Sequence, residues 1–213
     1  AGQRCSALRV LCLQDEIADH TLKMLRGAMA ECRMGNPGRL TTDIGPVIDS
    51  EAKANIERHI QTMRSKGRPV FQAVRENSED AREWQSGTFV APTLIELDDF
   101  AELQKEVFGP VLHVVRYNRN QLPELIEQIN ASGYGLTLGV HTRIDETIAQ
   151  VTGSAHVGNL YVNRNMVGAV VGVQPFGGEG LSGTGPKAGG PLYLYRLLAN
   201  RPESALAVTL ARQ

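Results

Sequence analysis

The chain has 213 residues and a formal net charge of −1, from 22 basic and 23 acidic residues that are mixed along the sequence. Because no basic stripe is present to hold a phosphate backbone, the composition argues against nucleic acid as a partner. Hydrophobic residues make up 42% and charged residues 21%, as in typical soluble globular proteins. No apolar run approaches the roughly 20 residues of a membrane-spanning helix, so we expect no membrane insertion.

The spacing of the cysteines and histidines bears on whether the chain forms disulfides or binds a metal. Three cysteines show no paired spacing, which indicates a reducing cytoplasm rather than a disulfide framework. The five histidines form no i, i+4 pair, and none has a cysteine or second histidine at ligand spacing, so we expect no metal site. The chain opens with neither an initiator Met nor a signal-peptide pattern, which is expected of a fragment of a longer protein.

Strand-like and helix-like segments alternate along the first half of the chain. An N-cap residue is predicted at Asp15 for the first helix, and at Asp49 or Ser50 for the second. The predicted elements of this half are a strand over residues 9–14, a helix with apolar residues at helical spacing through Cys32, a helix that ends before Gly67, a strand over residues 69–74 and an exposed loop over residues 76–87.

The same alternation continues through the second half. Its predicted elements are strands over residues 88–97, 111–117, 136–142 and 159–163, and helices over residues 122–129 and 144–151. Helices of this length between strands imply crossover connections, and therefore an α/β fold with a mostly parallel sheet covered by helices. Residues 165–190 are rich in glycine and small residues, and so long a loop in a compact domain indicates function.

Cys5 lies in a polar, glycine-containing segment, residues 2–6 (GQRCS), just before the first predicted strand. Most free cysteines are small buried hydrophobes, and this interpretation suits Cys12 and Cys32, which fall on apolar faces of their elements. It suits Cys5 poorly, because a polar turn is not a core environment. An adjacent arginine and nearby backbone amides favour the nucleophilic form of a thiol. From spacing alone, nucleophile and structural thiol both stay open for Cys5.

Glu106 and Phe108 stand two residues apart in residues 106–111 (EVFGPV), directly before a predicted strand. A carboxylate and a ring at this spacing suit a nucleotide, since the carboxylate accepts hydrogen bonds from ribose hydroxyls while the ring packs beside a base. Taken alone, the segment is better explained as a turn with one solvated glutamate and one core phenylalanine.

Residues 175–186 (PFGGEGLSGTGP) contain the dinucleotide fingerprint G-x-G-x-x-G, at Gly178, Gly180 and Gly183. We reject this match, because the fingerprint needs a strand before it and a helix that opens at its end. Here a Pro-Phe turn precedes the glycines and Pro186 soon follows them. We expect the glycines to let the backbone pass close to a ligand or to another domain.

In combination the three segments resemble the aldehyde dehydrogenase superfamily in order and spacing. Gly-Gln-x-Cys, Glu-x-Phe-Gly-Pro and Pro-Phe-Gly-Gly-x-x-x-Ser-Gly-x-Gly follow one another over essentially the whole chain. Residues 163–176 (NRNMVGAVVGVQPF) resemble the substrate-anchoring segment of glutamate-semialdehyde (1-pyrroline-5-carboxylate) dehydrogenases. The chain as a whole resembles part of the C-terminal region of the bifunctional proline-utilisation flavoproteins of enteric bacteria. This resemblance implies a single catalytic, cysteine-bearing (thiol) domain over residues 1–213.

The resemblance implies NAD-dependent oxidation of glutamate γ-semialdehyde to glutamate in proline catabolism. Cys5 would attack the aldehyde to give a thiohemiacetal, hydride would pass to NAD⁺, and water would hydrolyse the resulting thioester. The oxyanion would accept a hydrogen bond from the Cys5 amide. Glu106 would bind the nicotinamide ribose, Phe108 would pack beside the nicotinamide, and Phe176 would wall the aliphatic part of the substrate.

The same resemblance implies that Ser6, Gly168 and Ala169 hold the α-carboxylate of the substrate. Ala169 departs from the serine of some relatives, which removes one hydroxyl but leaves backbone amides that bind a carboxylate. A Rossmann-like NAD domain, a general-base glutamate and an oxyanion-hole asparagine are family parts that we expect upstream of Ala1, in a parent that forms a homo-oligomer. The isolated fragment is therefore expected to be inactive.

Two other functions stay open. The chain could be a catalytically silent module of the same fold that serves oligomerisation, although its intact cysteine and glutamate motifs favour the enzyme. It could also belong to a dehydrogenase for another semialdehyde such as succinate semialdehyde, which would call for an Arg or Lys where Gly168 and Ala169 stand.

Overall fold

The computed structural model describes residues 1–73, 87–170 and 172–198. The Cα positions form two compact units, Ala1–Ser132 and Gly133–Gln213, and each has sheets of its own. Within the described ranges, no helix is long and apolar enough to cross a membrane.

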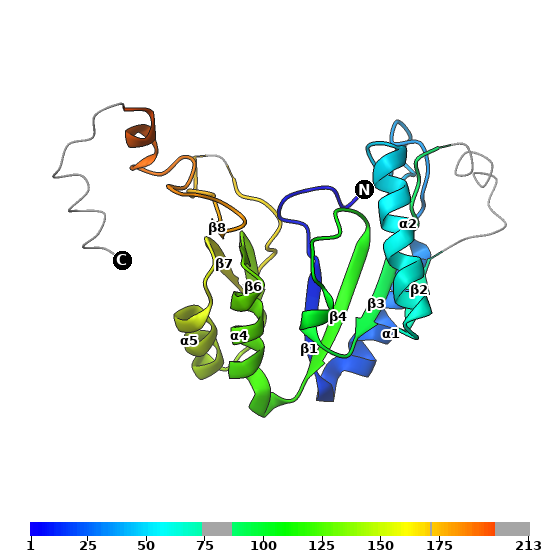
Figure 1. Ribbon diagram of the computed structural model, residues 1–213, viewed down its shortest axis with the longest axis horizontal. Coiled ribbons are helices and arrows are strands. Elements are labelled where there is room, and N and C mark those ends of the chain that lie inside the picture. The colour runs from blue at the N-terminus through cyan, green and yellow to red at the C-terminus, as the bar shows by residue number, and fades with distance from the viewer. Residues whose placement is uncertain (74–86, 171, 199–213) are drawn as a thin grey trace. The chain divides into compact units, whose positions relative to one another are not determined.

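The first unit is built on a four-stranded sheet with the order β1-β4-β3-β2 (Figure 1). The strands are β1 (Val10–Gln14), β4 (Val111–Tyr117), β3 (Thr93–Leu97) and β2 (Val70–Gln72). β4 pairs in parallel with both β1 and β3, whereas β2 joins the edge of β3 in the antiparallel direction. The predicted α/β class and mostly parallel sheet are therefore confirmed.

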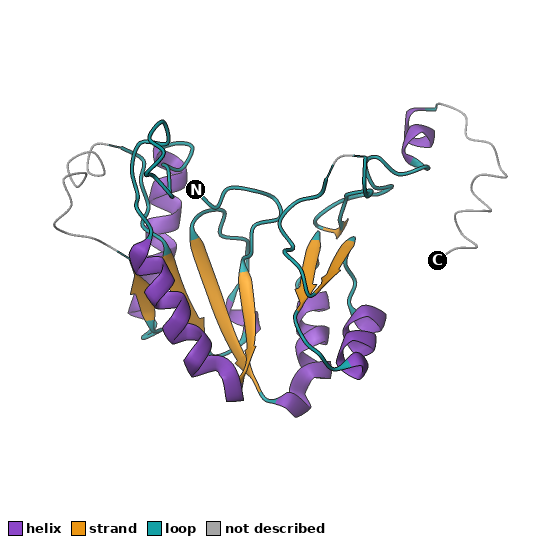
Figure 2. Cartoon of the chain, turned by 180° about the vertical axis from the view of Figure 1, so that it is seen from behind, coloured by secondary structure: helices purple, strands orange, loops and turns teal. Residues whose placement is uncertain are grey.

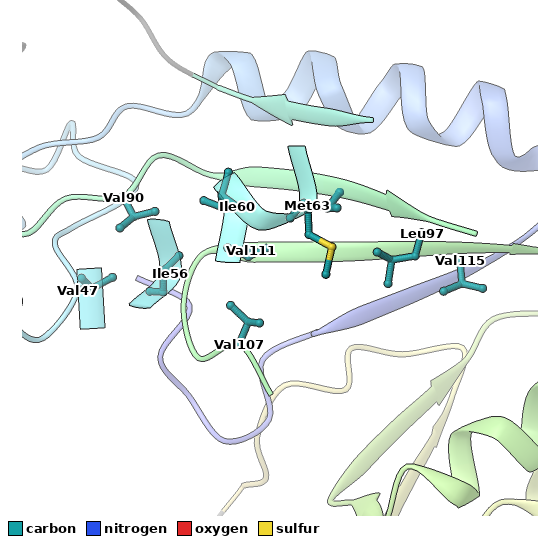
Figure 3. Packing of buried hydrophobic residues seen from close by; sticks show 10 residues of the cluster. Val47, Ile56, Ile60, Met63, Val90, Leu97, Val107, Val111 and Val115 are labelled. Carbon is teal, nitrogen blue, oxygen red and sulfur yellow. The ribbon is translucent and has the colours of Figure 1, made fainter. Parts of the chain in front are cut away.

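Helices α1 (Asp15–Glu31) and α2 (Ser50–Ser65) cover opposite faces of this sheet (Figure 2). Successive residues of a strand point to opposite faces, so that they pack against different helices. Leu94 packs with Leu13, Ala18, Leu22 and Val114 against α1, whereas its neighbour Ile95 belongs to a cluster packed against α2, called the α2 cluster below. The α2 cluster is shown in Figure 3 and consists of Val47, Ile56, Ile60, Met63, Val90, Ile95, Leu97, Val107, Val111 and Val115. Full burial of each such side chain contributes about 1.5–3 kcal/mol to the free energy of folding.

The two predicted helix caps have different outcomes. Of the two candidates predicted for α2, Asp49 is the N-cap, and its side chain accepts from the amide of Ala52 at 2.7 Å, whereas Ser50 is the first helical residue. The prediction for Asp15 is wrong, since α1 begins at Asp15 itself and Gln14 is the N-cap without a side-chain cap bond. The reason is that Gln14 is still paired with Tyr117 in the sheet, so the strand runs directly into the helix.

The strand predicted over residues 88–97 is shorter in the structure, because β3 begins only at Thr93. Pro92 has no N–H to donate to a ladder, so the strand cannot start before it. Thr88 pairs instead with Val47, whose amide donates to the Thr88 carbonyl at 2.8 Å. The strand predicted over residues 69–74 is seen as β2, and most of the loop predicted over residues 76–87 lies outside the described residues.

The first unit also contains three shorter elements, one before β4 and two after it. They are η1 (Phe100–Glu102), η2 (Arg119–Gln121) and α4 (Leu122–Ala131), of which only α4 was predicted. η1 and η2 are each closed by a capping box, from Asp99 and Asn118 respectively.

The second unit contains a β-α-β arrangement. β6 (Thr137–Val140) pairs in parallel with β7 (Asn159–Val162), and α5 (Asp145–Ser154) connects them, all as predicted. A two-residue ladder of β5 (Tyr134–Gly135) and β8 (Glu179–Gly180), and a 3-10 segment η3 (Tyr193–Leu197), were not predicted.

Candidate active site

Cys5 lies in a tight turn that precedes β1. The amide of Ala7 donates to the carbonyl of Arg4 at 3.1 Å, which closes the turn around Cys5 and Ser6. The residue Cys5 is exposed, whereas Ser6 is buried, at 3% exposure. The sequence interpretation of Cys5 as a turn residue outside the core is therefore confirmed, while the roles proposed for Cys5 and Ser6 stay predictions.

The other two cysteines, Cys12 and Cys32, lie in surroundings that suit a structural role. Cys12 is in β1 and packs against the α2 cluster, and burial raises the pKa of its thiol to about 12. At neutral pH Cys12 is therefore a thiol and a poor nucleophile. Cys32 caps the C-terminus of α1, and its Sγ donates to the carbonyl of Ala28 at 3.5 Å.

The Cys5 turn is packed directly against the segment of Glu106 and Phe108, about a hundred residues away in the sequence. Gly2 has a φ of +63°, and a Cβ on it would lie 2.5 Å from the carbonyl oxygen of Gly109. Gln3 donates from Nε2 to the carbonyl of Phe108 at 3.3 Å, and its Oε1 accepts from the amide of Ile48 at 2.8 Å. The first two sequence motifs are thus neighbours in space.

Arg9 binds both segments at once. Nε pairs with Oε1 of Glu106 at 2.9 Å, and Nη1 donates to the carbonyls of Gly2 at 2.7 Å and Gly109 at 3.2 Å. Nη2 donates to the carbonyl of Arg4 at 2.9 Å. The guanidinium carbon also lies 4.5 Å from the centre of the Phe108 ring, within cation–π range. A single arginine therefore connects the Cys5 turn with the predicted cofactor contacts.

The backbone of Arg9 is held in turn by a buried histidine. The His113 amide and Nδ1 approach the Arg9 carbonyl at 3.0 and 3.2 Å, and His113 Nε2 lies 2.8 Å from Nε2 of His59. Since a carbonyl only accepts, His113 carries its proton on Nδ1 and accepts from His59. Burial, followed by the nearby His59, lowers the pKa of His113 to about 4, so the ring is neutral at neutral pH.

Glu106 and Phe108 fit the contacts that the nicotinamide end of NAD would need. The Glu106 side chain is 34% exposed and Phe108 is 42% exposed, so both can be reached from solvent. Arg9 binds Oε1 of Glu106, so that Oε2 could accept from another donor such as a ribose hydroxyl. These residues would hold only one end of the cofactor.

Gly168 and Ala169 lie in the second unit, in the loop that follows β7. The hydroxyl of Tyr161 donates to the Gly168 carbonyl at 2.9 Å and accepts from Nε2 of Gln174 at 2.7 Å. Gly168 has a φ of +77° and nothing within 4 Å of the place of a Cβ. Ala169 is half-buried. Tyr161, which is buried, thereby ties the predicted carboxylate-binding loop to the β6–β7 sheet.

Phe176 lies in the same unit and forms an antiparallel bridge with Ala188, with bonds of 3.0 and 2.9 Å. Asn159, at the start of β7, positions the loop around it. The Asn159 side chain donates to the carbonyl of Pro175 at 2.9 Å and accepts from the amide of Gly177 at 3.1 Å. The half-buried Phe176 is therefore held by a short segment with well-defined backbone contacts.

The glycines after Phe176 permit close backbone approach within the second unit itself. A Cβ on Gly178 would lie 2.5 Å from the carbonyl oxygen of Ser182, and one on Gly183 would lie 2.6 Å from that of Gly178. Gly180 packs in the same way on Gly133, at 2.4 Å. Residues 181–192 form turns and loops rather than a helix, so rejection of the dinucleotide fingerprint is confirmed. The neighbour that these glycines approach is the unit's own backbone.

Sequence reasoning missed the positioning residues Arg9, His113, Tyr161 and Asn159. Each lies in or beside a strand, and each contacts a backbone carbonyl that lies outside its own strand. An arginine immediately before an apolar strand was the one available signal, at Arg9. In the parts of the chain that the structure describes, no group of three or more His, Cys, Asp or Glu side chains is placed to hold a metal ion.

Comparison with known proteins matches the chain to a family model. Residues 1–199 match the aldehyde dehydrogenase family. The bifunctional protein PutA of Salmonella typhimurium is 92% identical over the whole chain, which spans 16% of that protein.

Solved structures agree with this match. A mutant of Bradyrhizobium japonicum proline utilization A (PutA) is 52% identical, with a TM-score of 0.83 over 91% of this chain and 19% of its own. A 1-pyrroline-5-carboxylate dehydrogenase from Thermus, solved with bound NAD, is 36% identical, with a TM-score of 0.78 over 91% of this chain and 36% of its own. The resemblance in the three sequence motifs is thereby confirmed, and the chain belongs to the aldehyde dehydrogenase family.

Proposed function

We propose that these residues supply the nucleophile and the nicotinamide-side contacts of an NAD-dependent dehydrogenase that oxidises glutamate γ-semialdehyde to glutamate. The observation that carries the proposal is the pairing of the Cys5 turn with the Glu106–Phe108 segment through Gln3 and Arg9. An exposed thiol in a turn that is joined to the segment of an exposed carboxylate and ring suits a reaction in which a covalent intermediate meets a nucleotide cofactor. The names of the relatives, PutA and 1-pyrroline-5-carboxylate dehydrogenase, support the choice of substrate.

Cys5 would act as the nucleophile. Its sulfur forms a bond to the aldehyde carbon, and the carbonyl electron pair moves to oxygen, where the Cys5 amide donates a hydrogen bond to the oxyanion. Collapse of this thiohemiacetal restores the carbonyl as a thioester, and the carbon is oxidised as its hydride leaves. Water then cleaves the carbon–sulfur bond, which releases glutamate and regenerates the thiolate.

NAD⁺, when bound, would supply the hydride acceptor. Glu106 would accept hydrogen bonds from the nicotinamide ribose hydroxyls through the oxygen that Arg9 leaves available. The Phe108 ring would pack beside the nicotinamide. Both residues belong to the segment that is packed on the Cys5 turn, so they would hold the cofactor next to the nucleophile.

Substrate selection would depend on Ser6, Gly168, Ala169 and Phe176. Backbone amides of the loop at Gly168, whose carbonyl is held by Tyr161, would bind the α-carboxylate. Phe176 would contact the aliphatic carbons between the two ends of the substrate. Arg164 is the cation nearest in sequence, and it lies 4.7 Å over the Tyr161 ring, which does not resemble the carboxylate clamp that succinate semialdehyde would need.

The activity would require parts beyond these residues. We propose that the chain works within a longer protein, called the full-length protein below, with an upstream NAD-binding domain that brings the general-base glutamate and the oxyanion-hole asparagine. The share of each relative that the chain spans supports this arrangement. We also propose that the full-length protein is a cytoplasmic homo-oligomer.

The test is a substrate panel on the full-length protein, with NADH formation as the readout. Glutamate semialdehyde should have the highest kcat/KM, ahead of succinate semialdehyde and simple aliphatic aldehydes. A preference for succinate semialdehyde would contradict the substrate assignment. The absence of turnover with every aldehyde, together with an unreactive Cys5 in thiol titration, would instead identify a catalytically silent module.

A further inference from the structure

Arg9 contacts both segments of the candidate site, yet the proposed chemistry assigns it no role. Its side chain is only 14% exposed and makes four hydrogen bonds, all to the Cys5 turn or to the segment of residues 106–110. A surface arginine that served only solubility would not bury its head group among carbonyls.

The bond from Arg9 to Arg4 sets the direction of the Cys5 amide. In a trans peptide the carbonyl and the following N–H point to opposite sides. The Arg4–Cys5 bond is trans, and the Arg4 carbonyl is held by both Nη2 of Arg9 at 2.9 Å and the amide of Ala7 at 3.1 Å. The Cys5 N–H is therefore directed away from the guanidinium, in an orientation that Arg9 helps to maintain.

Arg9 also restricts the positions of Glu106 and Phe108, the two side chains predicted to contact the cofactor. Nε binds one oxygen of Glu106, which restricts the carboxylate and leaves its second oxygen for another donor. The guanidinium plane also lies over the Phe108 ring, and Nη1 holds the carbonyl of the next residue, Gly109. Both side chains are more than 30% exposed, so without Arg9 little else in the first unit would restrain their rotamers.

We propose that Arg9 is a positioning residue for the dehydrogenase reaction. It orients the Cys5 amide toward the oxyanion and holds Glu106 and Phe108 against the cofactor, so that the nucleophile and the cofactor site keep one fixed geometry. This proposal rests on the proposed function. A lysine could not replace Arg9 fully, because one ammonium nitrogen can pair with Glu106 but cannot also reach carbonyls on both segments.

The experiment compares Arg9→Gln and Arg9→Lys with the wild type in the full-length protein. Arg9→Gln should lower kcat at least about tenfold and raise the KM for NAD⁺ about tenfold, since both an oxyanion donor and a ribose contact lose their support. The KM for the aldehyde should stay within about threefold, because the proposed function assigns the α-carboxylate and the aliphatic carbons of the substrate to Gly168, Ala169 and Phe176 and not to Arg9. Arg9→Lys should restore the KM for NAD⁺ through its pairing with Glu106, but leave kcat low.

Arg116→Gln is the matched control, because Arg116 is another arginine of the same unit with several side-chain hydrogen bonds, in its case three to the carboxylates of Glu96 and Asp19. It should lower the unfolding temperature without changing either kinetic constant. Unchanged kinetics in folded Arg9→Gln, or the same loss in Arg116→Gln, would overturn the role of Arg9. If Arg9→Gln does not fold, wild-type kcat in Arg9→Lys would overturn it. An inactive wild type would contradict the proposed function itself, which separates the two failures.

Discussion

Gly2 and Gly109 are in van der Waals contact, so closely that a Cβ on Gly2 would lie 2.5 Å from the Gly109 carbonyl oxygen and 2.9 Å from the nitrogen of Pro110. Gly2 also has a φ of +63°, a conformation that other residues adopt at a cost. Two motifs that stand about a hundred residues apart are thus joined where only a glycine fits.

Gly2→Ala should therefore displace the Cys5 turn from the segment of Glu106 and lower dehydrogenase kcat/KM in the full-length protein at least about tenfold, because the clash is with backbone atoms that cannot rotate away. Gly67→Ala is the control. Gly67 has a φ of +76°, but nothing lies within 4 Å of its Cβ position, so this variant should lose only about 1 kcal/mol of stability. Steady-state kinetics and thermal unfolding would show both effects, and equal kinetics in the two variants would contradict the prediction.

Cys5→Ala and Cys5→Ser should abolish dehydrogenase turnover in the full-length protein, since neither side chain can form the thioester. Cys12→Ala should keep its activity and lose about 1 kcal/mol of stability, because truncation of a thiol packed against the core leaves a small cavity. Cys32→Ala should likewise retain activity. NADH formation measures the first effect and urea denaturation the second. Turnover that survives in Cys5→Ala would rule out the nucleophile assignment.

Glu106→Gln should raise the KM for NAD⁺ or slow turnover by tenfold or more, with little change in aldehyde binding. A charge-assisted hydrogen bond to a ribose hydroxyl contributes roughly 1.5–3 kcal/mol, and the substitution also removes the charge that pairs with Arg9. Glu102→Gln removes a carboxylate that pairs with Arg68 in the same unit and should leave the KM for NAD⁺ unchanged. Altered aldehyde kinetics with unchanged NAD⁺ kinetics would show that the cofactor role is wrong.

The 213-residue chain by itself should show no dehydrogenase activity and no tight NAD⁺ binding. Its predicted contacts reach only the nicotinamide end, whereas the adenosine and pyrophosphate need a strand, a glycine turn and a helix N-terminus. The glycines at 178, 180 and 183 instead pack on their own unit and lead into loops. Calorimetry should detect at most about millimolar affinity. Micromolar binding would mean that the cofactor site has been misplaced.

Acid should destabilise the first unit through His113. Burial lowers its pKa from 6.5 to about 4, so between these values the unfolded chain binds more protons than the folded one. The stabilisation is fully present above pH 6.5 and decreases as the pH falls toward 4, by up to about 3 kcal/mol. Urea denaturation of the chain at several pH values measures this dependence. His113→Gln should flatten it and His20→Gln, at an exposed position, should not; equal slopes in all three proteins would exclude His113 as the cause.

The sequence by itself determined the longer helices and most of the longer strands, together with the identity of the chemical groups. Periodicity predicted β4 at its observed bounds and α2 with its Asp49 cap, because these signals depend on residues within a few positions of one another. The order and spacing of three motifs were enough to indicate the family, and the polar turn singled out Cys5 among the cysteines.

Only the tertiary structure decided how the groups are held. The contact by which Arg9 joins the Cys5 turn to Glu106, and the contact by which His113 holds the Arg9 carbonyl, depend on partners far away in the sequence. Such contacts leave no periodic signal, because a side chain that donates to a backbone carbonyl is insensitive to the identity of the residue that bears it. Parallel pairing of β1 with β4 is what brings Arg9 beside His113, and sheet order cannot be derived from local propensity.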